Sequence, residues 1–128
     1  MTEVGVVIGT NGEAIYWHLP PGRTGGSIPD DRNLWDVLWT AHKNGTLAGF
    51  AHSHPGGGVP GPSYEDVTTF SAIELAFGQR YPWWIASSDH LVVLNWVGED
   101  KYAYKRNVVS VEPIWLVELR QASNYNEE

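Results

Sequence analysis

The chain has 128 residues, no cysteine and a formal net charge of −7 at pH 7. With 42% hydrophobic residues and neither repeats nor a change of composition, it predicts a single domain over residues 1–128. The lack of cysteine excludes disulfides and thiolate chemistry. The acidic charge argues against nucleic-acid binding, which usually needs a basic patch.

An N-terminal β-hairpin is predicted first. Residues 4–8 and 13–18 are rich in strand-forming side chains and flank the turn signal Asn11-Gly12. The connection over residues 20–29 holds too many glycines and prolines for regular structure, so it predicts a surface loop.

A helix is predicted after this loop. Asp30 or Asp31 can cap its first turn, and Asn44-Gly45 ends it. Helical spacing relates its apolar positions, which are Leu34, Trp35, Leu38, Trp39 and His42.

A second helical pattern begins at Ser63 and ends at Gly78. The side chains available for burial in it are Val67, Phe70, Ile73, Leu75 and Phe77. Residues 82–87 and 91–97 are apolar runs that predict a central hairpin.

The last part of the chain is less regular. Residues 101–106 alternate as a strand, and residues 108–111 predict a further short one. From residue 113 onward the pattern fits either a helix or an edge strand, and residues 124–128 predict a frayed tail. The whole order predicts an α/β fold, a mixed β-sheet flanked by helices.

Two histidines close the strand that is predicted between the two helices. Residues 46–51 are small and apolar enough for a buried strand, and Pro55 cannot continue its hydrogen-bond ladder. Because side chains alternate along a strand, His52 and His54 point to the same face and Ser53 to the other. A carboxylate brought back by the following loop would complete a His/His/carboxylate set, which leaves a fourth tetrahedral position for water, as in a catalytic zinc site.

The motifs around these histidines resemble those of the JAMM (also called JAB or MPN) metalloprotease family. The matching segments are His52-Ser53-His54-Pro55 and, after seven loop residues, Ser63-Tyr64-Glu65-Asp66. The order of hairpin, helix, histidine strand and helix is also similar to that family. The resemblance implies a cytidine-deaminase-like fold and a zinc hydrolase that cleaves peptide or isopeptide bonds, either next to a ubiquitin-like protein or in a bacterial or phage protein.

The resemblance also implies individual roles. His52, His54 and Asp66 would hold Zn²⁺ and a water whose pKa falls toward about 7. The Ser63 hydroxyl would help to stabilise the tetrahedral oxyanion. The same Ser63 and Asp66 form a capping-box pattern at the start of a helix, and the two interpretations can partly coexist.

A glutamate near the first strand would act as general acid and base. Glu3 fits best because residues 3–9 resemble the family's Glu-led strand, although the spacing is about one residue shorter. Glu13, at the start of the next strand, is the alternative. The other histidines, His18, His42 and His90, are interpreted as structural.

A protein or peptide partner and a cytoplasmic location are expected, with neither a nucleic acid nor a membrane as partner. Residues 20–29, residues 56–58 and some tryptophans are candidates for a substrate groove. Two other functions stay open: a catalytically inactive scaffold domain of the same family, and a DNA-associated relative whose motif also carries Pro62-Ser63-Tyr64-Glu65-Asp66.

Overall fold

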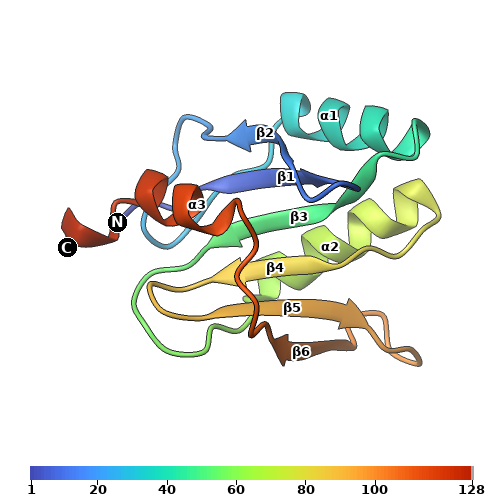
Figure 1. Ribbon diagram of the computed structural model, residues 1–128. Coiled ribbons are helices and arrows are strands. Elements are labelled where there is room, and N and C mark those ends of the chain that lie inside the picture. The colour runs from blue at the N-terminus through green and yellow to red at the C-terminus, as the bar shows by residue number, and fades with distance from the viewer. Residues whose placement is uncertain (128) are drawn as a thin grey trace.

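The computed structural model describes residues 1–127 and shows an α/β domain with a six-stranded mixed sheet and three helices (Figure 1). The strands run in the order β2-β1-β3-β4-β5-β6. The elements are β1 (Gly5–Gly9), β2 (Ala14–His18), α1 (Arg32–Lys43), β3 (Leu47–Ser53), α2 (Tyr64–Phe77), β4 (Trp83–Ala86), β5 (Leu91–Trp96), β6 (Tyr104–Val108), α3 (Leu116–Ser123) and a short 3-10 helix (Tyr125–Glu127).

The predicted N-terminal hairpin is confirmed, and its inner strand pairs with the histidine strand. β1 runs antiparallel to both β2 and β3. Gly5 lies opposite His18 on one side and opposite His52 on the other, so these residues form one row across three strands. Gly9, at the other end of β1, lies opposite Leu47. The start of β1 is therefore at the histidine end of β3.

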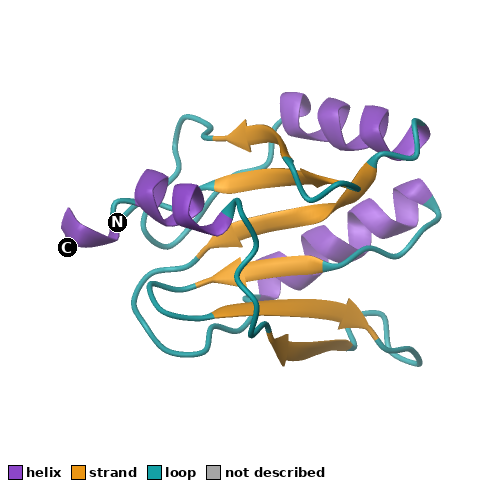
Figure 2. Cartoon of the chain, viewed as in Figure 1, coloured by secondary structure: helices purple, strands orange, loops and turns teal. Residues whose placement is uncertain are grey.

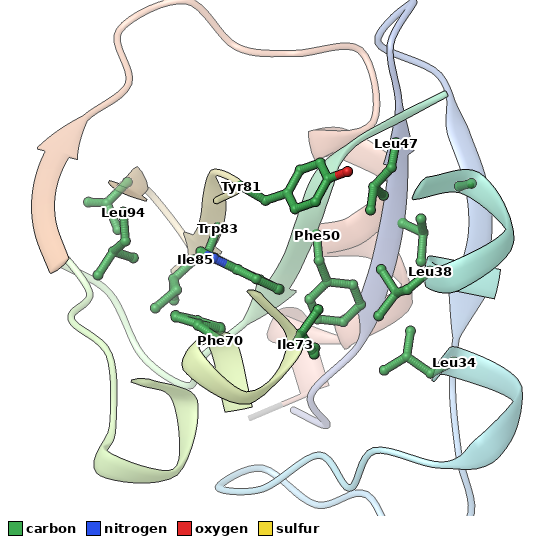
Figure 3. Packing of buried hydrophobic residues seen from close by; sticks show 13 residues of the cluster. Leu34, Leu38, Leu47, Phe50, Phe70, Ile73, Tyr81, Trp83, Ile85 and Leu94 are labelled. Carbon is green, nitrogen blue, oxygen red and sulfur yellow. The ribbon is translucent and has the colours of Figure 1, made fainter. Parts of the chain in front are cut away.

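Helices cover both faces of the sheet, which gives three layers (Figure 2). On one face, α1 and α2 bury a cluster that includes Leu34, Leu38, Phe50, Phe70, Ile73 and Trp83 (Figure 3). On the other face, Trp115, Leu116 and Leu119 of the α3 segment cover Val4, Val6, Ile8 and Ala51. The crossover through α2 makes β3 and β4 parallel, whereas the other neighbouring strands are antiparallel.

The caps predicted for the helices are confirmed. The Asp31 carboxylate accepts the Leu34 N–H at 2.8 Å, which identifies Asp31 rather than Asp30 as the cap of α1. α2 begins after Ser63 and ends at Gly78, whose φ of 69° is left-handed. Glycine is favoured at such a position because it has no Cβ to clash with the backbone.

Two large apolar side chains are not buried as expected. Trp39 on α1 is 45% exposed and Leu75 on α2 is 67% exposed. In α2 the buried stripe passes through Phe70, Ile73 and the charged Glu74, and Leu75 lies one residue, about 100°, beyond it. Helical spacing predicts which residues of a helix share a face. Which residues at the edge of that face are buried depends on the elements that pack against the helix.

The C-terminal strand begins later than predicted. β6 starts at Tyr104 rather than at residue 101, because residues 98–103 form a turn in which Gly98 and Glu99 have positive φ angles of 102° and 67°. The separate strand predicted over residues 108–111 is wrong, since Val108 is the last residue of β6.

Beyond residue 113 the sequence fits either a helix or an edge strand, and the structure has a helix there, α3. The prediction of a frayed tail is wrong over residues 124–127, and residue 128 lies outside the described residues. The Tyr125 hydroxyl donates to the carbonyl oxygens of His54 and Ala86, so the tail contacts the end of the histidine strand. Within residues 1–127, no helix is both long enough and apolar enough to cross a membrane.

Candidate metal centre

His52 and His54 point to the same side of the sheet, toward α1 and α2. Their Nε2 atoms lie 3.0 Å apart. His52 is the sixth residue of β3, and His54 follows the strand while its N–H still donates to the Ala86 carbonyl at 2.8 Å. The two-residue period of a strand thus brings two imidazole nitrogens to one point.

Asp66, in the first turn of α2, lies against both imidazoles. One carboxylate oxygen is 3.2 Å from His52 Nε2 and the other is 3.0 Å from His54 Nε2. The same side chain accepts the Ser63 N–H at 2.9 Å, while Ser63 Oγ accepts the Asp66 N–H at 3.0 Å. The capping box and the contact with the histidines therefore occur together, because each uses different lone pairs of one carboxylate.

The spacing of these atoms fits a zinc ion. Two ligand atoms bound tetrahedrally at about 2.0–2.1 Å are roughly 3.3 Å apart. The two histidine Nε2 atoms are 3.0 Å apart, slightly less than this spacing, and each lies against a different Asp66 oxygen, at 3.2 Å for His52 and 3.0 Å for His54. A set of two imidazoles and one carboxylate is a ligand set that zinc accepts, so the residues present fit the metal that the motif implies.

Glu3 lies at the same cluster. The ligand atoms of Glu3, His52 and His54 are all within 4.8 Å of one another, and Glu3 is only 4% exposed. Its backbone is held by the loop after β2, because its N–H donates to Thr24 at 2.8 Å and its carbonyl accepts from Arg23 at 3.1 Å. By distance alone Glu3 could complete a metal-binding group with the two histidines, while Asp66 is the carboxylate in direct contact with both imidazoles.

Glu13 is not brought to this cluster. Its carbonyl accepts the Gly9 N–H at 2.9 Å, at the end of β1 opposite to the end that pairs with His52. Gly9 lies four residue steps beyond Gly5 along β1, which is roughly 13 Å. The hairpin register thus places Glu3, and not Glu13, near the histidines.

The surroundings of the two carboxylates push their pKa values in opposite directions. Burial raises the pKa of Glu3, and the nearby His52 and His54 oppose this only in part. Burial would also raise the pKa of Asp66, but His52, His54 and the Ser63 N–H outweigh it and hold this pKa well below its usual range. Two nearby carboxylates whose pKa values are shifted in opposite directions are suited to different tasks. One can carry a proton, and the other stays negatively charged.

His52 is affected by the same neighbours. Burial would lower the pKa of its imidazole, but the hydrogen bond and the charge of Asp66, with a smaller contribution from Glu3, outweigh burial and raise it. In the metal-free protein the imidazole thus favours a proton at the position that a cation would take. A bound metal ion would replace this proton, since a histidine ligand must be neutral.

A hydrogen-bond network behind the histidines was not found by sequence reasoning. Ser53, between the two histidines, faces the opposite layer, where its Oγ accepts the Val4 N–H at 3.0 Å and the Ser123 hydroxyl at 2.7 Å. Thr2 N–H donates to the Ser123 carbonyl at 2.9 Å. The network therefore ties the backbone on both sides of Glu3 to the histidine strand. The alternation that places Ser53 on the far face was the only available signal.

Each remaining histidine has a protein partner through one ring nitrogen, but the Nδ1 of His18 is buried without a hydrogen-bond partner among the described residues, and His18 also lines the cavity at the histidines. The partner contacts are His18 Nε2 with the Pro29 carbonyl at 2.7 Å, His42 Nδ1 with the Tyr81 hydroxyl at 2.6 Å, and His90 Nδ1 with the Asp89 carboxylate at 2.9 Å. The contact between His18 and Pro29 holds the loop before α1 against the sheet.

A cavity of about 670 Å³ opens at the metal centre, and Glu3, His52, His54, Ser63 and Asp66 all line it. Only the second part of the predicted loop contributes to its lining, through Gly26, Ser27, Ile28 and Pro29. The prediction for residues 56–58 is not met, because Gly58 is instead bound to the turn after β4 through Ser87 and Asp89. Of the tryptophans, Trp83 lines the cavity, but it is only 2% exposed.

No protein-family model matches the chain, and no curated protein matches it. The resemblance to the JAMM family therefore rests on the two motifs and stays a prediction. What the structure adds is independent of family membership: the distances, burial and charges of the residues at one end of β3.

Proposed function

We propose that the protein is a zinc-dependent peptidase or isopeptidase of the JAMM type, with the cytidine-deaminase-like fold of that family. The observation that carries the proposal is the convergence of Glu3, His52, His54 and Asp66 in one cavity. They come from three separate segments of the chain. Convergence of these residue types at one cavity is more typical of a reaction site than of structural hydrogen bonding.

Each residue has a task in this proposal. His52, His54 and Asp66 would hold Zn²⁺, which supplies a Lewis acid and a nucleophilic hydroxide near neutral pH. Glu3, with its raised pKa, would accept the proton of the attacking water and return it to the leaving amine. Ser63 Oγ uses a lone pair for the helix cap, so its hydroxyl hydrogen is left to donate to the oxyanion.

The substrate in this proposal is a protein or peptide. The candidates are the C-terminal tail of a ubiquitin-like protein and a bacterial or phage structural peptide. The acidic chain, with a net charge of −7, favours these over a nucleic acid.

The test is zinc content together with hydrolysis of a ubiquitin-like fusion and of a bacterial cell-wall or phage structural peptide. We expect the protein to bind about one zinc ion and to cleave at least one of these substrates. Glu3→Gln should lower turnover by roughly 100-fold or more while zinc stays bound. Glu13→Gln is the matched control and should keep full activity.

The other possible outcomes would contradict the role of one residue or favour a different function. Full activity of Glu3→Gln would contradict the role of Glu3. A variant Ser63→Ala that loses zinc would contradict an oxyanion role for Ser63, because turnover alone should fall. Zinc binding without hydrolysis would favour the inactive scaffold, and a salt-dependent affinity for DNA would favour the DNA-associated relative.

A further inference from the structure

The helices α1 and α2 form a V that opens at the metal centre. At their C-terminal ends they meet through Phe77, whose ring lies 5.4 Å from that of Trp39 and 4.8 Å from that of His42. Toward their N-terminal ends they diverge (Figure 1). The cavity lies between these open ends, since both Leu34 of α1 and Asp66 of α2 line it.

The floor of the cavity next to the metal centre is apolar. The rings of Phe50 and Phe70 each lie 6.3 Å from the ring of His52. Leu34, Leu38 and Ile73 also line the cavity, and Figure 3 shows them packed beside Phe50. These floor side chains are only 1 to 8% exposed, so the apolar surface that a peptide at the zinc ligands would meet beside the reacting bond is completed by the half-buried Ile28.

The two rims of the cavity differ. One is the loop before α1, which contributes the half-buried Ile28 and the exposed Asp30. The other is the first part of α2, which contributes Glu65 and the half-buried Thr69. Each rim thus carries one carboxylate above an apolar floor, an arrangement that disfavours an acidic side chain and favours an uncharged one.

We propose that this cavity is a specificity pocket for a large apolar side chain, aromatic or branched, on the substrate residue next to the bond that is cleaved. The inference rests on the proposed function and adds the substrate class that this site selects. Ile28 and Thr69 are the specificity-determining residues, because they line opposite walls and neither belongs to the metal centre.

The test uses amino-acid hydroxamates as probes, since the hydroxamate group binds zinc and the side chain can be varied alone. Affinities of the glycine, leucine, phenylalanine and aspartate compounds are measured on the zinc-loaded protein, with cleavage of matching peptides alongside. We expect the phenylalanine and leucine compounds to bind roughly 10- to 200-fold more tightly than the glycine compound. The aspartate compound should bind most weakly.

Two variants locate the preference in this pocket. Thr69→Phe narrows the cavity and should bring the ratio of the phenylalanine affinity to the glycine affinity close to one. Ile28→Ala removes apolar surface from the opposite rim, on a loop rather than in a helix, and should lower the preference several-fold. The control is Val97→Ala, at a residue that is 62% exposed and does not line the cavity.

The outcomes separate the two proposals. Zinc binding with equal affinities across the four compounds would overturn the pocket and leave the metal centre intact. A preference that survives unchanged in both Thr69→Phe and Ile28→Ala would also overturn it. A protein that binds no zinc would contradict the proposed function, and the pocket proposal would fall with it.

Discussion

Helix α2 carries two carboxylates in very different surroundings. Asp66 lies in its first turn beside His52 and His54, and Glu74, roughly two turns later, is 2% exposed on the same side of the sheet. Both are removed from water and both contact cationic or polar side chains. They differ in the groups that surround them. This difference distinguishes a candidate functional carboxylate, Asp66, from a structural one, Glu74, whose hydrogen bonds hold the fold together.

Glu74 is surrounded by hydrogen-bond donors. It accepts from Arg80 at 3.1 Å, from the Tyr81 N–H at 2.8 Å, from Trp83 Nε1 at 3.3 Å and from the Tyr104 hydroxyl. These donors come from the segment after α2, from β4 and from β6. Every donor is matched to the carboxylate, so this Glu74 network needs nothing from outside the protein.

Asp66 accepts the Ser63 N–H, but its other close neighbours are two imidazoles and the nearby Glu3, groups that can act as acceptors as well as donors. Glu3 and the Nε2 atoms of both histidines lie close together at a cavity, and neutral imidazoles offer lone pairs there. Such a group of lone pairs is stabilised by a cation. A complete set of donors thus marks the Glu74 network as structural, whereas the convergence of two imidazoles and two carboxylates at a cavity marks the candidate metal centre.

The largest expected effect is on stability, from Glu74→Ala. This change leaves several buried donors without an acceptor, and we expect the free energy of unfolding to fall by roughly 3–5 kcal/mol. Urea denaturation measures it. Glu118→Ala, at an exposed position of α3, is the matched control and should change stability by less than about 0.5 kcal/mol. A loss below about 1 kcal/mol would show that the Glu74 network is not an anchor.

Asp66→Asn should affect zinc binding more than the stability of the fold. We expect zinc affinity to fall by more than about 100-fold, because a charged ligand is lost and not merely a supporting group. The metal-free protein should also lose some stability, because the fold holds the pKa of Asp66 well below its usual range and asparagine lacks the charge. The loss should stay smaller than that of Glu74→Ala, since asparagine can still accept a hydrogen bond at the helix start. Zinc titration and metal-free unfolding at pH 8 measure the two quantities.

The matched control is Asp36→Asn, on the exposed face of α1. It should alter neither the zinc affinity nor the stability of the metal-free protein. Should Asp66→Asn destabilise the metal-free protein as strongly as Glu74→Ala, the two carboxylates would both be anchors and the contrast would fail.

Tyr104→Phe should have a smaller effect that depends on pH. Burial, together with the hydrogen bond to Glu74, raises the pKa of Tyr104. The folded protein therefore holds this proton more tightly than the unfolded chain, so the stabilisation is complete below about pH 10 and declines as the pH rises above it. We expect a loss of roughly 1–2 kcal/mol at pH 8 that shrinks above pH 10, measured by urea denaturation across pH. A loss that grows with pH would contradict this.

The smallest expected effect belongs to Arg80→Ala. The Arg80 side chain is 47% exposed, and solvent screens its ion pair with Glu74. Its guanidinium also lies 3.9 Å from the ring centre of Trp96. We expect thermal or urea denaturation to show a loss of about 0.5–1 kcal/mol, against almost none for the exposed control Lys105→Ala. A loss near that of Glu74→Ala would mean that Arg80 alone carries the network.

Local patterns predicted much of the fold and the relative placement of His52, His54, Ser63 and Asp66. The strand period places His52 and His54 on one face, and the cap at Ser63 places Asp66 in the first turn of α2. These predictions succeed because they depend on neighbours within a few residues. Errors occurred where long-range contacts decide, as at the exposed Leu75 and in the tail, where Tyr125 contacts His54.

The sequence by itself determined the histidine pair, both helix caps and the α/β order of elements, since backbone geometry and short-range hydrogen bonds are encoded locally. Only the tertiary structure decided between Glu3 and Glu13, because the register of β1 against β3 sets which end of the hairpin meets His52. It also decided that Glu74 is buried among donors from β4 and β6 and that the cavity lies between α1 and α2. These features depend on segments far apart in the chain, and no spacing along the chain encodes which of them meet.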